Sequence, residues 1–198
     1  MRYRLAIAVA TVGALVVVSG ASADLINGYT ATGAPAHIKP LTTAQYTVVL
    51  TNTSPDKTAD HAAIGIPAGF TVAPDGVEAT ATCGSSTWDV EQPVPSADGK
   101  ITVRRQNGSE NNLCPGGTLT IVFSATSPAD EGSYVWATEL VRGADTFVLN
   151  GNQPSVQVDG TAPLVAISSH PDNPTNATTA TFEFSANEPA AFMCKLDD

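Results

Sequence analysis

Apolar and polar residues alternate along most of the chain after Asp24, which is the pattern of strands with one buried face. The alternation is clearest in two segments, 45–51 and 118–123. Their larger apolar side chains recur at every second position: Tyr46, Val48, Leu50, Leu119, Ile121 and Phe123. Such a period indicates half-buried antiparallel strands, and the period of a helix is almost absent. The sequence therefore predicts an all-β protein.

Shorter segments of the same kind follow one another, rich in the threonine and valine that a pleated surface favours. We expect further strands at 62–66, 70–73, 77–83, 87–90, 100–105, 134–141, 146–149, 155–158 and 181–185. Turn residues separate them. Asp98-Gly99 and Asn150-Gly151 are the sharpest hairpin signals, because both residues of each pair tolerate positive φ. Many short strands joined by such turns favour an antiparallel β-sandwich.

One sandwich is expected to occupy residues 24–160, a length sufficient for a sizeable hydrophobic core. The expected core residues are Tyr46, Val48, Leu50, Ile64, Ile66, Phe70, Trp88, Ile101, Val103, Leu119, Ile121, Phe123, Val135 and Trp136. Residues 158–163 are typical of a short linker. Residues 161–198 supply two or three strands, about half a sandwich, so we expect them to pair with each other and to leave an apolar face open to water. The aromatic side chains of that face are Phe182, Phe184 and Phe192.

The N-terminus has the three parts of a secretory signal. Two arginines precede an uncharged apolar stretch at 5–18, and the small residues A-S-A at 21–23 fit a signal peptidase site. We therefore expect residues 1–23 to be a signal peptide and the mature chain to begin at Asp24. An uncleaved membrane anchor is the alternative, because residues 5–23 could just span a bilayer. The small residues at the end of the stretch favour cleavage.

The charge balance excludes some classes of partner. The whole chain has 9 basic and 19 acidic residues, and removal of the two signal arginines leaves 7 basic residues and a formal charge of −12. Nucleic acids and anionic membrane surfaces both require basic patches, so neither is an expected partner. Calcium would need about six to eight oxygen ligands. The acids at 130–131, Asp159 and Asp172 are too scattered for that, so a solvated acidic surface is the favoured interpretation.

Three cysteines in an exported chain indicate disulfide chemistry, because the compartment is oxidising. Cys83 and Cys114 lie in the same expected sandwich, each beside a boundary between a strand and a turn. We predict that they form a disulfide. Cys194 is then left unpaired within this chain.

The last segment reads TAPLVAISSHPDNPTNATTATFEFSANEPAAFMCKLDD. It contains P-x-V-x-I at 163–167, N-P-T-N-x-T at 173–178, T-F-x-F-S at 181–185 and C-x-L-D at 194–197. This series resembles the bacterial Ig-like repeat that occurs in tandem on secreted and cell-surface proteins. The resemblance implies an Ig-like module that is truncated here, and a partner for Cys194 beyond the end of this chain.

The expected sandwich carries a second resemblance. Residues 45–72 fit the pattern Y-x-V-x-L-x-N-T-S followed by I-x-I-P-A-G-F, and residues 114–138 contain P-G, V-x-F-x-A-T and G-x-Y. Both segments resemble the conserved repeat modules of bacterial, especially actinobacterial, envelope proteins. The resemblance implies an Ig-like sandwich, and its motifs mark strands and turns rather than catalytic groups. Residues 71–112 depart from the pattern, so no strand order is predicted there.

No catalytic signature accompanies these modules. Nucleophile elbow, zinc-protease, phosphate-loop and dinucleotide-binding motifs are absent from the sequence, so no catalytic, cofactor or metal residue is assigned. The resulting hypothesis is a non-enzymatic structural or adhesion module, secreted and associated with the cell surface. Its partner would be a surface protein or glycan, with no insertion into the membrane after signal cleavage.

Two alternatives remain open. The chain could be an accessory module of a larger secreted enzyme, which the downstream sequence would decide. It could also be a carbohydrate-binding module, a class that usually displays a row of exposed aromatic rings. Trp88 and Trp136 occupy strand positions, and we expect both to be buried. Exposure of both on one face would favour carbohydrate binding.

Overall fold

The computed structural model of this chain describes residues 27–84, 86–172, 176, 178–188 and 190–195. The expected signal peptide, residues 1–23, lies outside the described residues. The described part is built from strands, and its helical element is the short 3-10 helix η1 (Ser109–Asn111). Within that part, no helix has the length and apolar character needed to cross a membrane. The all-β prediction is confirmed.

The strands are short, as the turn residues predict. In chain order they are β1 (Gly28–Ala34), β2 (His37–Ile38), β3 (Thr43–Asn52), β4 (His61–Gly65), β5 (Thr71–Val72), β6 (Glu78–Ala81), β7 (Thr87–Val90), β8 (Lys100–Arg105), β9 (Thr118–Thr126), β10 (Gly132–Val135), β11 (Ala137–Arg142), β12 (Asp145–Thr146), β13 (Val148–Leu149), β14 (Ser155–Val158), β15 (Val165–Ser169) and β16 (Glu183–Ala186).

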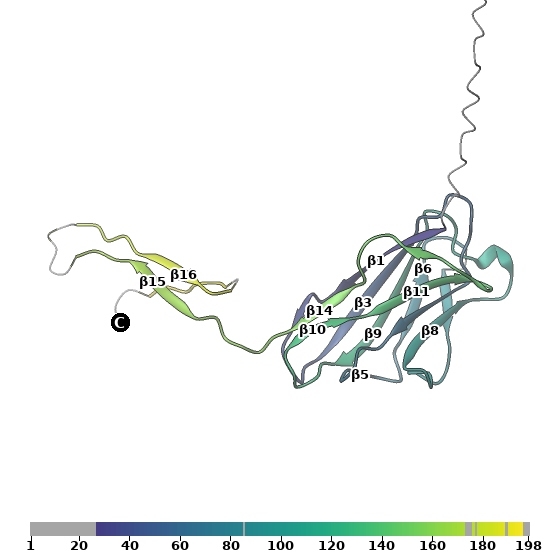
Figure 1. Cartoon of the computed structure of the whole chain (residues 1–198), viewed down its shortest axis with the longest axis horizontal. Helices are drawn as coiled ribbons and strands as arrows, with labels where there is room; N and C mark the ends of the chain where they lie inside the picture. Colours follow the sequence, from purple (N-terminus) through teal and green to yellow (C-terminus); the bar gives the residue numbers. More distant parts are fainter. Residues whose placement is uncertain (1–26, 85, 173–175, 177, 189, 196–198) are drawn as a thin grey trace, which may run out of the picture.

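Most of these strands belong to one sheet that folds over on itself. Its strands pair in the order β12-β11-β4-β8-β7-β6-β9-β3-β1-β13, and β5 pairs with β9. Although β1 and β11 lie near opposite ends of this order, the Tyr29 hydroxyl on β1 donates a hydrogen bond to the Thr138 carbonyl on β11 at 2.5 Å. The two halves of the sheet therefore face each other, and the predicted β-sandwich is confirmed (Figure 1).

A three-stranded sheet, β10-β14-β2, completes the sandwich. Its pairing shows that one predicted strand was wrong. Residues 134–141 do not form a single strand. They divide at Trp136 into β10, which pairs with β14, and β11, which pairs with β4. The Trp136 amide donates to the Pro154 carbonyl at 2.9 Å, so the chain changes partner strand at this residue.

The two hairpin signals have different outcomes. Gly99 adopts a φ of 74° and its amide donates to the Ser96 carbonyl, so Asp98-Gly99 does form a turn, but at the end of a longer loop between β7 and β8. Asn150-Gly151 forms no hairpin, because β13 before it pairs in parallel with β1 and β14 after it belongs to the other sheet. The Asn150 side chain instead donates to the Thr53 hydroxyl at 2.9 Å.

The core lies between the two halves of the folded sheet. Twelve of the fourteen expected core residues are buried; Ile66 is partly buried and Val135 is 50% exposed. Val135 points outward because it alternates with Tyr134 and the buried Trp136 along the strand. At the centre, the Trp136 ring lies 5.0–5.2 Å from three other rings, those of Tyr46, Phe70 and Phe123. This aromatic cluster joins β3 and β9 to the β10–β11 crossing.

The strands β15 and β16 pair only with each other, in a separate two-stranded sheet. Figure 1 shows this hairpin extending away from the sandwich. The expected strand at 181–185 begins two residues later, at Glu183. All residues of β15, and three of the four in β16, are exposed.

Candidate interaction surfaces

The chain enters the sandwich at one end and leaves it at the other. We call the end of β3 that carries Asn52 the entry pole, because the Thr53 amide donates to the Gly28 carbonyl there at 2.9 Å. The opposite end of β3 is the exit pole, where Ser127 and Thr42 share hydrogen bonds beside Pro40 and Gly160. The ten residues of β3 separate the poles by about 30 Å at the usual strand rise.

The entry pole is organised around a fully buried amide, that of Asn52. Its side-chain nitrogen donates to the Lys57 carbonyl at 2.8 Å and to the Leu113 carbonyl at 3.2 Å, and its side-chain oxygen accepts from the Ser54 amide at 3.0 Å. Its backbone amide and carbonyl bond to Gly117 and Gly116. The Asn52 side chain therefore joins the loop between β3 and β4 to the loop between β8 and β9.

The predicted disulfide is present at the same end of the sandwich. Cys83 and Cys114 are bonded, with their Cα atoms 6.1 Å apart, and the Cys114 amide also donates to the Cys83 sulfur. The bond connects the segment after β6 to the loop before β9. Cys194 is exposed and forms no disulfide within the described part of the chain.

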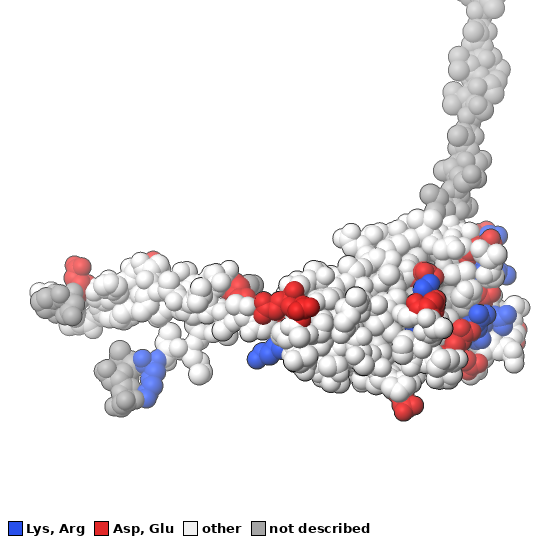
Figure 2. Space-filling view, turned by 60° about the horizontal axis from the view of Figure 1, so that its bottom comes forward, with Lys and Arg blue, Asp and Glu red and all other residues white. Residues whose placement is uncertain are grey.

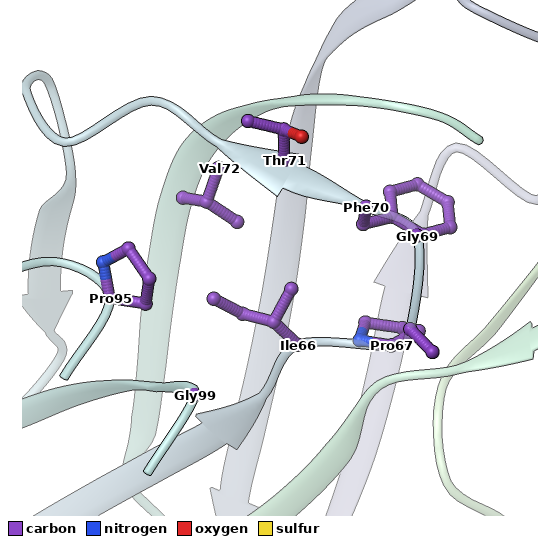
Figure 3. Close-up of a pocket in the computed structure, with 9 residues that line it drawn as sticks. Ile66, Pro67, Gly69, Phe70, Thr71, Val72, Pro95 and Gly99 are labelled. Atoms are coloured by element: carbon purple, nitrogen blue, oxygen red, sulfur yellow. The ribbon is translucent and has the colours of Figure 1, made fainter. Parts of the chain in front are cut away.

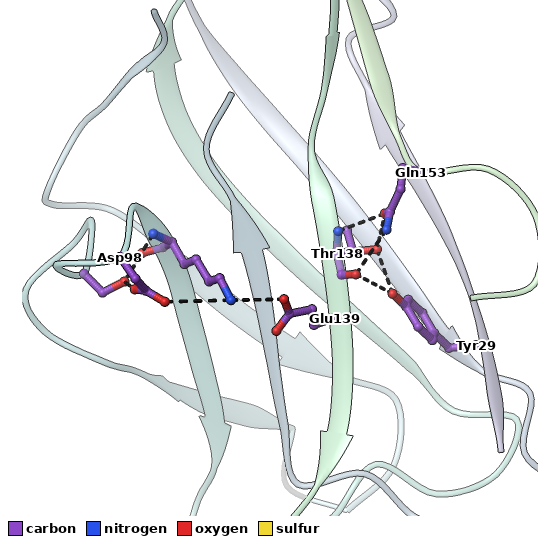
Figure 4. Close-up of polar contacts among 7 residues, drawn as sticks. Tyr29, Asp98, Thr138, Glu139 and Gln153 are labelled. Atoms are coloured by element: carbon purple, nitrogen blue, oxygen red, sulfur yellow. Dashed lines mark hydrogen bonds and ion pairs between the residues drawn. The ribbon is translucent and has the colours of Figure 1, made fainter. Parts of the chain in front are cut away.

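A second buried network holds β1 against β11 (Figure 4). Besides accepting from Tyr29, the Thr138 backbone carbonyl accepts from the side-chain nitrogen of Gln153 at 3.2 Å. The Thr138 backbone amide and hydroxyl both donate to the side-chain oxygen of Gln153. Burial raises the pKa of the Tyr29 hydroxyl, which keeps it protonated as a donor. The network joins the two layers of the sandwich, because Tyr29 lies on β1 and Thr138 on β11.

Figure 4 also shows a charged contact on the outer surface of the same sheet. The Lys100 ammonium on β8 lies 3.0 Å from the Glu139 carboxylate on β11, and β4 runs between these two strands. This contact raises the pKa of Lys100. The Ser96 hydroxyl lowers the pKa of the Asp98 carboxyl by donating to it. Exposed contacts of this kind add little to stability.

At the exit pole, the Glu131 carboxylate holds the chain that leaves the sandwich. It accepts hydrogen bonds from the Gly160 amide at 2.9 Å and from the Thr161 hydroxyl at 3.0 and 3.1 Å. Gly160 is packed so tightly that an added Cβ would lie 2.8 Å from the ring of Pro40. We call this set of contacts the exit joint.

The exit joint lies in an acidic part of the surface. Figure 2 shows acidic side chains gathered where the hairpin leaves the sandwich. The Asp159 carboxylate accepts from the Thr161 amide at 2.9 Å, so this acid is also used within the joint. Across the residues that the structure describes, no group of three metal-ligating side chains could hold an ion.

A shallow apolar pocket of about 350 Å³ opens beside the loop between β4 and β5 (Figure 3). Its lining residues are Ile66, Pro67, Ala68, Gly69, Phe70, Thr71, Val72, Pro95 and Gly99. Ile66, Val72 and Pro95 gather around it, and Thr71 contributes the single polar side chain. A ligand with a charge would find no opposite charge in this lining.

Sequence reasoning found the cysteine pair and both tryptophans, whose side chains are each 2% exposed. It placed Asn52 at the end of a strand without its buried hydrogen bonds, and it missed Tyr29, Gln153 and Glu131 as structural groups. Only the strand-ending Asn52 carried a local signal. The other three act across sequence separations of 15 to 109 residues, which no local pattern records.

Comparison with known proteins gives structural likeness only. No protein-family model matches this chain, and no curated protein sequence matches it. A non-cellulosomal cohesin from Archaeoglobus fulgidus aligns at 11% identity and a TM-score of 0.43, covering 67% of this chain and 92% of that one. The N-terminal domain of the Streptococcus gordonii adhesin Sgo0707 aligns at 12% identity and a TM-score of 0.46, over 66% of this chain and 32% of that one.

A third solved structure belongs to a protein of Corynebacterium diphtheriae described as membrane anchored. It aligns at 10% identity and a TM-score of 0.47, over 67% of this chain and 36% of that one. Similarity at this level identifies neither a family nor a function. The two poles, the disulfide and the exit joint are the structural features that bear on function.

Proposed function

We propose that this chain is a non-enzymatic extracellular spacer, a stalk or adhesion module of a bacterial surface protein. In this proposal residues 1–23 are a cleaved signal peptide, residues 24–160 are an Ig-like sandwich, and residues 161–198 begin a second Ig-like repeat. The supporting observation is that the chain enters and leaves at opposite poles. Modules connected in this way add their lengths, here about 30 Å for the sandwich.

The disulfide supports the extracellular part of the proposal. Disulfides persist in oxidising compartments such as the bacterial cell exterior and are rare in the cytosol. Cys83–Cys114 closes a loop with a sequence separation of 31 residues. A cross-link of this kind keeps a module folded outside the cell, where chaperones that use ATP do not operate.

The exit joint supports the spacer part. A spacer must hold the next segment in a fixed orientation, and a linker whose residues rotate freely would not do so. Here the first two residues after Asp159 are fixed by hydrogen bonds to Glu131 and by packing on Pro40. The proposed partner of such a spacer is a protein or a glycan. No described side chain of the sandwich indicates which of the two it is.

The carbohydrate-binding alternative loses its main support. Its platform would have used Trp88 and Trp136, and both side chains are buried in the core. An accessory module of a secreted enzyme would have the same arrangement of poles, and it would be connected to a catalytic domain.

The exit joint gives a direct test of the spacer proposal. We expect Glu131→Ala to free the linker, because the change removes the acceptor for both the Gly160 amide and the Thr161 hydroxyl. The backbone order parameters of Gly160 and Thr161, measured by NMR relaxation, should fall from about 0.85 toward values below about 0.6. The sandwich should keep its chemical shifts and its free energy of unfolding.

Asp130→Ala is the matched control. It removes the same charge from the neighbouring residue, whose contact in this region is a backbone carbonyl that accepts from Tyr134. Glu131→Gln keeps the acceptor oxygen and should give an intermediate result. A linker that is already mobile in the unchanged protein would contradict the spacer proposal, because the joint would then transmit no direction.

A further inference from the structure

Three asparagines of the chain are followed directly by glycine, and they differ in how the fold holds their side chains. They are Asn27, Asn107 and Asn150. Glycine has no side chain to shield its backbone nitrogen, so this nitrogen can approach the side-chain carbon of the asparagine before it. The two atoms can bond only if the asparagine side chain is free to turn toward the nitrogen.

Hydrogen bonds hold the side chains of Asn27 and Asn150. The Asn150 side-chain nitrogen donates to the Thr53 hydroxyl at 2.9 Å. The same side chain packs so closely on Gly28 that a Cβ on this glycine would clash with it. The Asn27 side-chain oxygen accepts from the Ser54 hydroxyl at 3.0 Å. Either asparagine must give up these contacts before it can react with the glycine that follows it.

Asn107 is held in no such way. It is exposed in the loop between β8 and η1, and its side chain has no hydrogen-bond partner among the described residues. Within the same part of the chain, the Gly108 amide donates to no acceptor. The Asn107 backbone carbonyl accepts from the Asn111 side chain. This bond favours the deprotonated form of the Gly108 nitrogen, because a hydrogen bond to the charged form of a group stabilises that form.

The loop also requires glycine after Asn107. Gly108 has a φ of 100°, a left-handed value that other residues rarely adopt. A Cβ at this position would clash with the Glu110 carboxylate. The unshielded nitrogen beside Asn107 is therefore a fixed feature of the fold.

We propose that Asn107 is a site of spontaneous deamidation, with water as the co-reactant. The Gly108 nitrogen gives up its proton and bonds to the side-chain carbon of Asn107, while the side-chain nitrogen takes up a proton and leaves as ammonia. Water then opens the resulting succinimide ring at either of its carbonyl carbons. The products are aspartate and isoaspartate, and no oxidant or reductant takes part. The inference does not depend on the spacer function of the sandwich.

The reaction would alter the loop that leads to the entry pole. It adds a negative charge beside Arg105, whose guanidinium donates to the carbonyls of Gln106 and Gly108 at 2.9 and 2.8 Å. Isoaspartate also lengthens the main chain between these two carbonyls by one carbon. We therefore expect isoaspartate at position 107 to displace at least one of the two hydrogen bonds.

The test is peptide mass spectrometry of the chain from Asp24 onward, incubated folded for several days at neutral pH and body temperature. The solvent is water labelled with heavy oxygen, so that conversion during the incubation is distinguished from earlier conversion. Digestion with pepsin in acid limits further reaction, and fragment spectra assign each change to one asparagine. We expect Asn107 to convert at least tenfold faster than Asn27 or Asn150. Unfolding in guanidinium chloride should bring the three rates together, because each asparagine then precedes a glycine in a free chain.

Two variants serve as controls. Asn107→Gln should stay unmodified at this position, because glutamine would have to close a larger ring. Thr53→Ala removes the partner of the Asn150 side chain and should raise conversion at Asn150 several-fold without changing the rate at Asn107. An Asn107 that stays unconverted in the folded protein overturns the proposal. A rate at Asn107 no higher than that at Asn150 also overturns it, because the fold would then not select the site.

Discussion

Replacing Trp136 by alanine should lower the free energy of unfolding by about 3–5 kcal/mol, the usual cost of deleting a buried large aromatic side chain. The indole is 2% exposed and its ring is packed against Tyr46, Phe70 and Phe123. It also lies where the chain passes from β10 to β11. The cavity would therefore open at the point that joins the two sheets. Urea denaturation followed by tyrosine fluorescence or circular dichroism measures the change.

Two variants separate packing from other effects. Trp136→Phe keeps a ring in the cluster and should cost less than half as much. Among the described residues the indole nitrogen has no hydrogen-bond partner whose loss would add to the cost. Val135→Ala changes the neighbouring exposed residue and should stay within about 0.5 kcal/mol. A loss below about 1 kcal/mol for Trp136→Ala would mean that the aromatic cluster is not the centre of the core.

Removal of the disulfide should have an effect of similar size. With Cys83 and Cys114 both changed to alanine, the free energy of unfolding should fall by about 3–4 kcal/mol, because the unfolded chain regains the freedom of a loop of 31 residues. The measurement is the free energy of unfolding from urea denaturation, with the slope m fitted separately for each protein. The slope itself should rise, since an uncrosslinked chain exposes more surface when it unfolds.

Cys194→Ser is the control for the disulfide, since that thiol is exposed and forms no disulfide in the described structure. It should leave the midpoint unchanged. An unaltered midpoint in the Cys83→Ala/Cys114→Ala variant would show that the bond does not constrain the unfolded state. Reduction of the disulfide in the unchanged protein should lower the free energy of unfolding by the same amount as the double substitution.

The sequence pattern predicted the interior of the sandwich well because strand alternation is local. In β3 and β9 the residues Tyr46, Val48, Leu50, Leu119, Ile121 and Phe123 are all buried, as their spacing indicates. The split of residues 134–141 was not predictable in the same way. Alternation continues through Trp136 without a break, and only the change of partner from β14 to β4 reveals two strands.

The functional surfaces depended even more on tertiary structure. Asn150-Gly151 has the composition of a tight turn, but the Asn150 side chain is held by Thr53, almost a hundred residues earlier. Glu131 looked like one of many solvated acids, and it becomes the anchor of the exit joint only because β10 and β14 lie side by side. The sequence carries no local trace of either contact.

The spacer proposal makes a mechanical prediction that follows from the strand directions. Force applied between the poles pulls β1 along β3, where six residue pairs are in register from Tyr29↔Asn52 to Ala34↔Thr47. Ladder hydrogen bonds lie perpendicular to the strands, so this force loads many of them at once. Force applied between two points at the entry pole would instead open the same ladder one pair at a time.

Single-molecule force spectroscopy on residues 24–198 carrying Cys194→Ser tests this most directly. One handle is attached at the N-terminus, and the second at Ala162→Cys for pole-to-pole loading or at Pro55→Cys for loading within the entry pole. The spacer account predicts an unfolding force several-fold higher for the pole-to-pole geometry. A pole-to-pole force equal to or below that of the entry-pole geometry would contradict it.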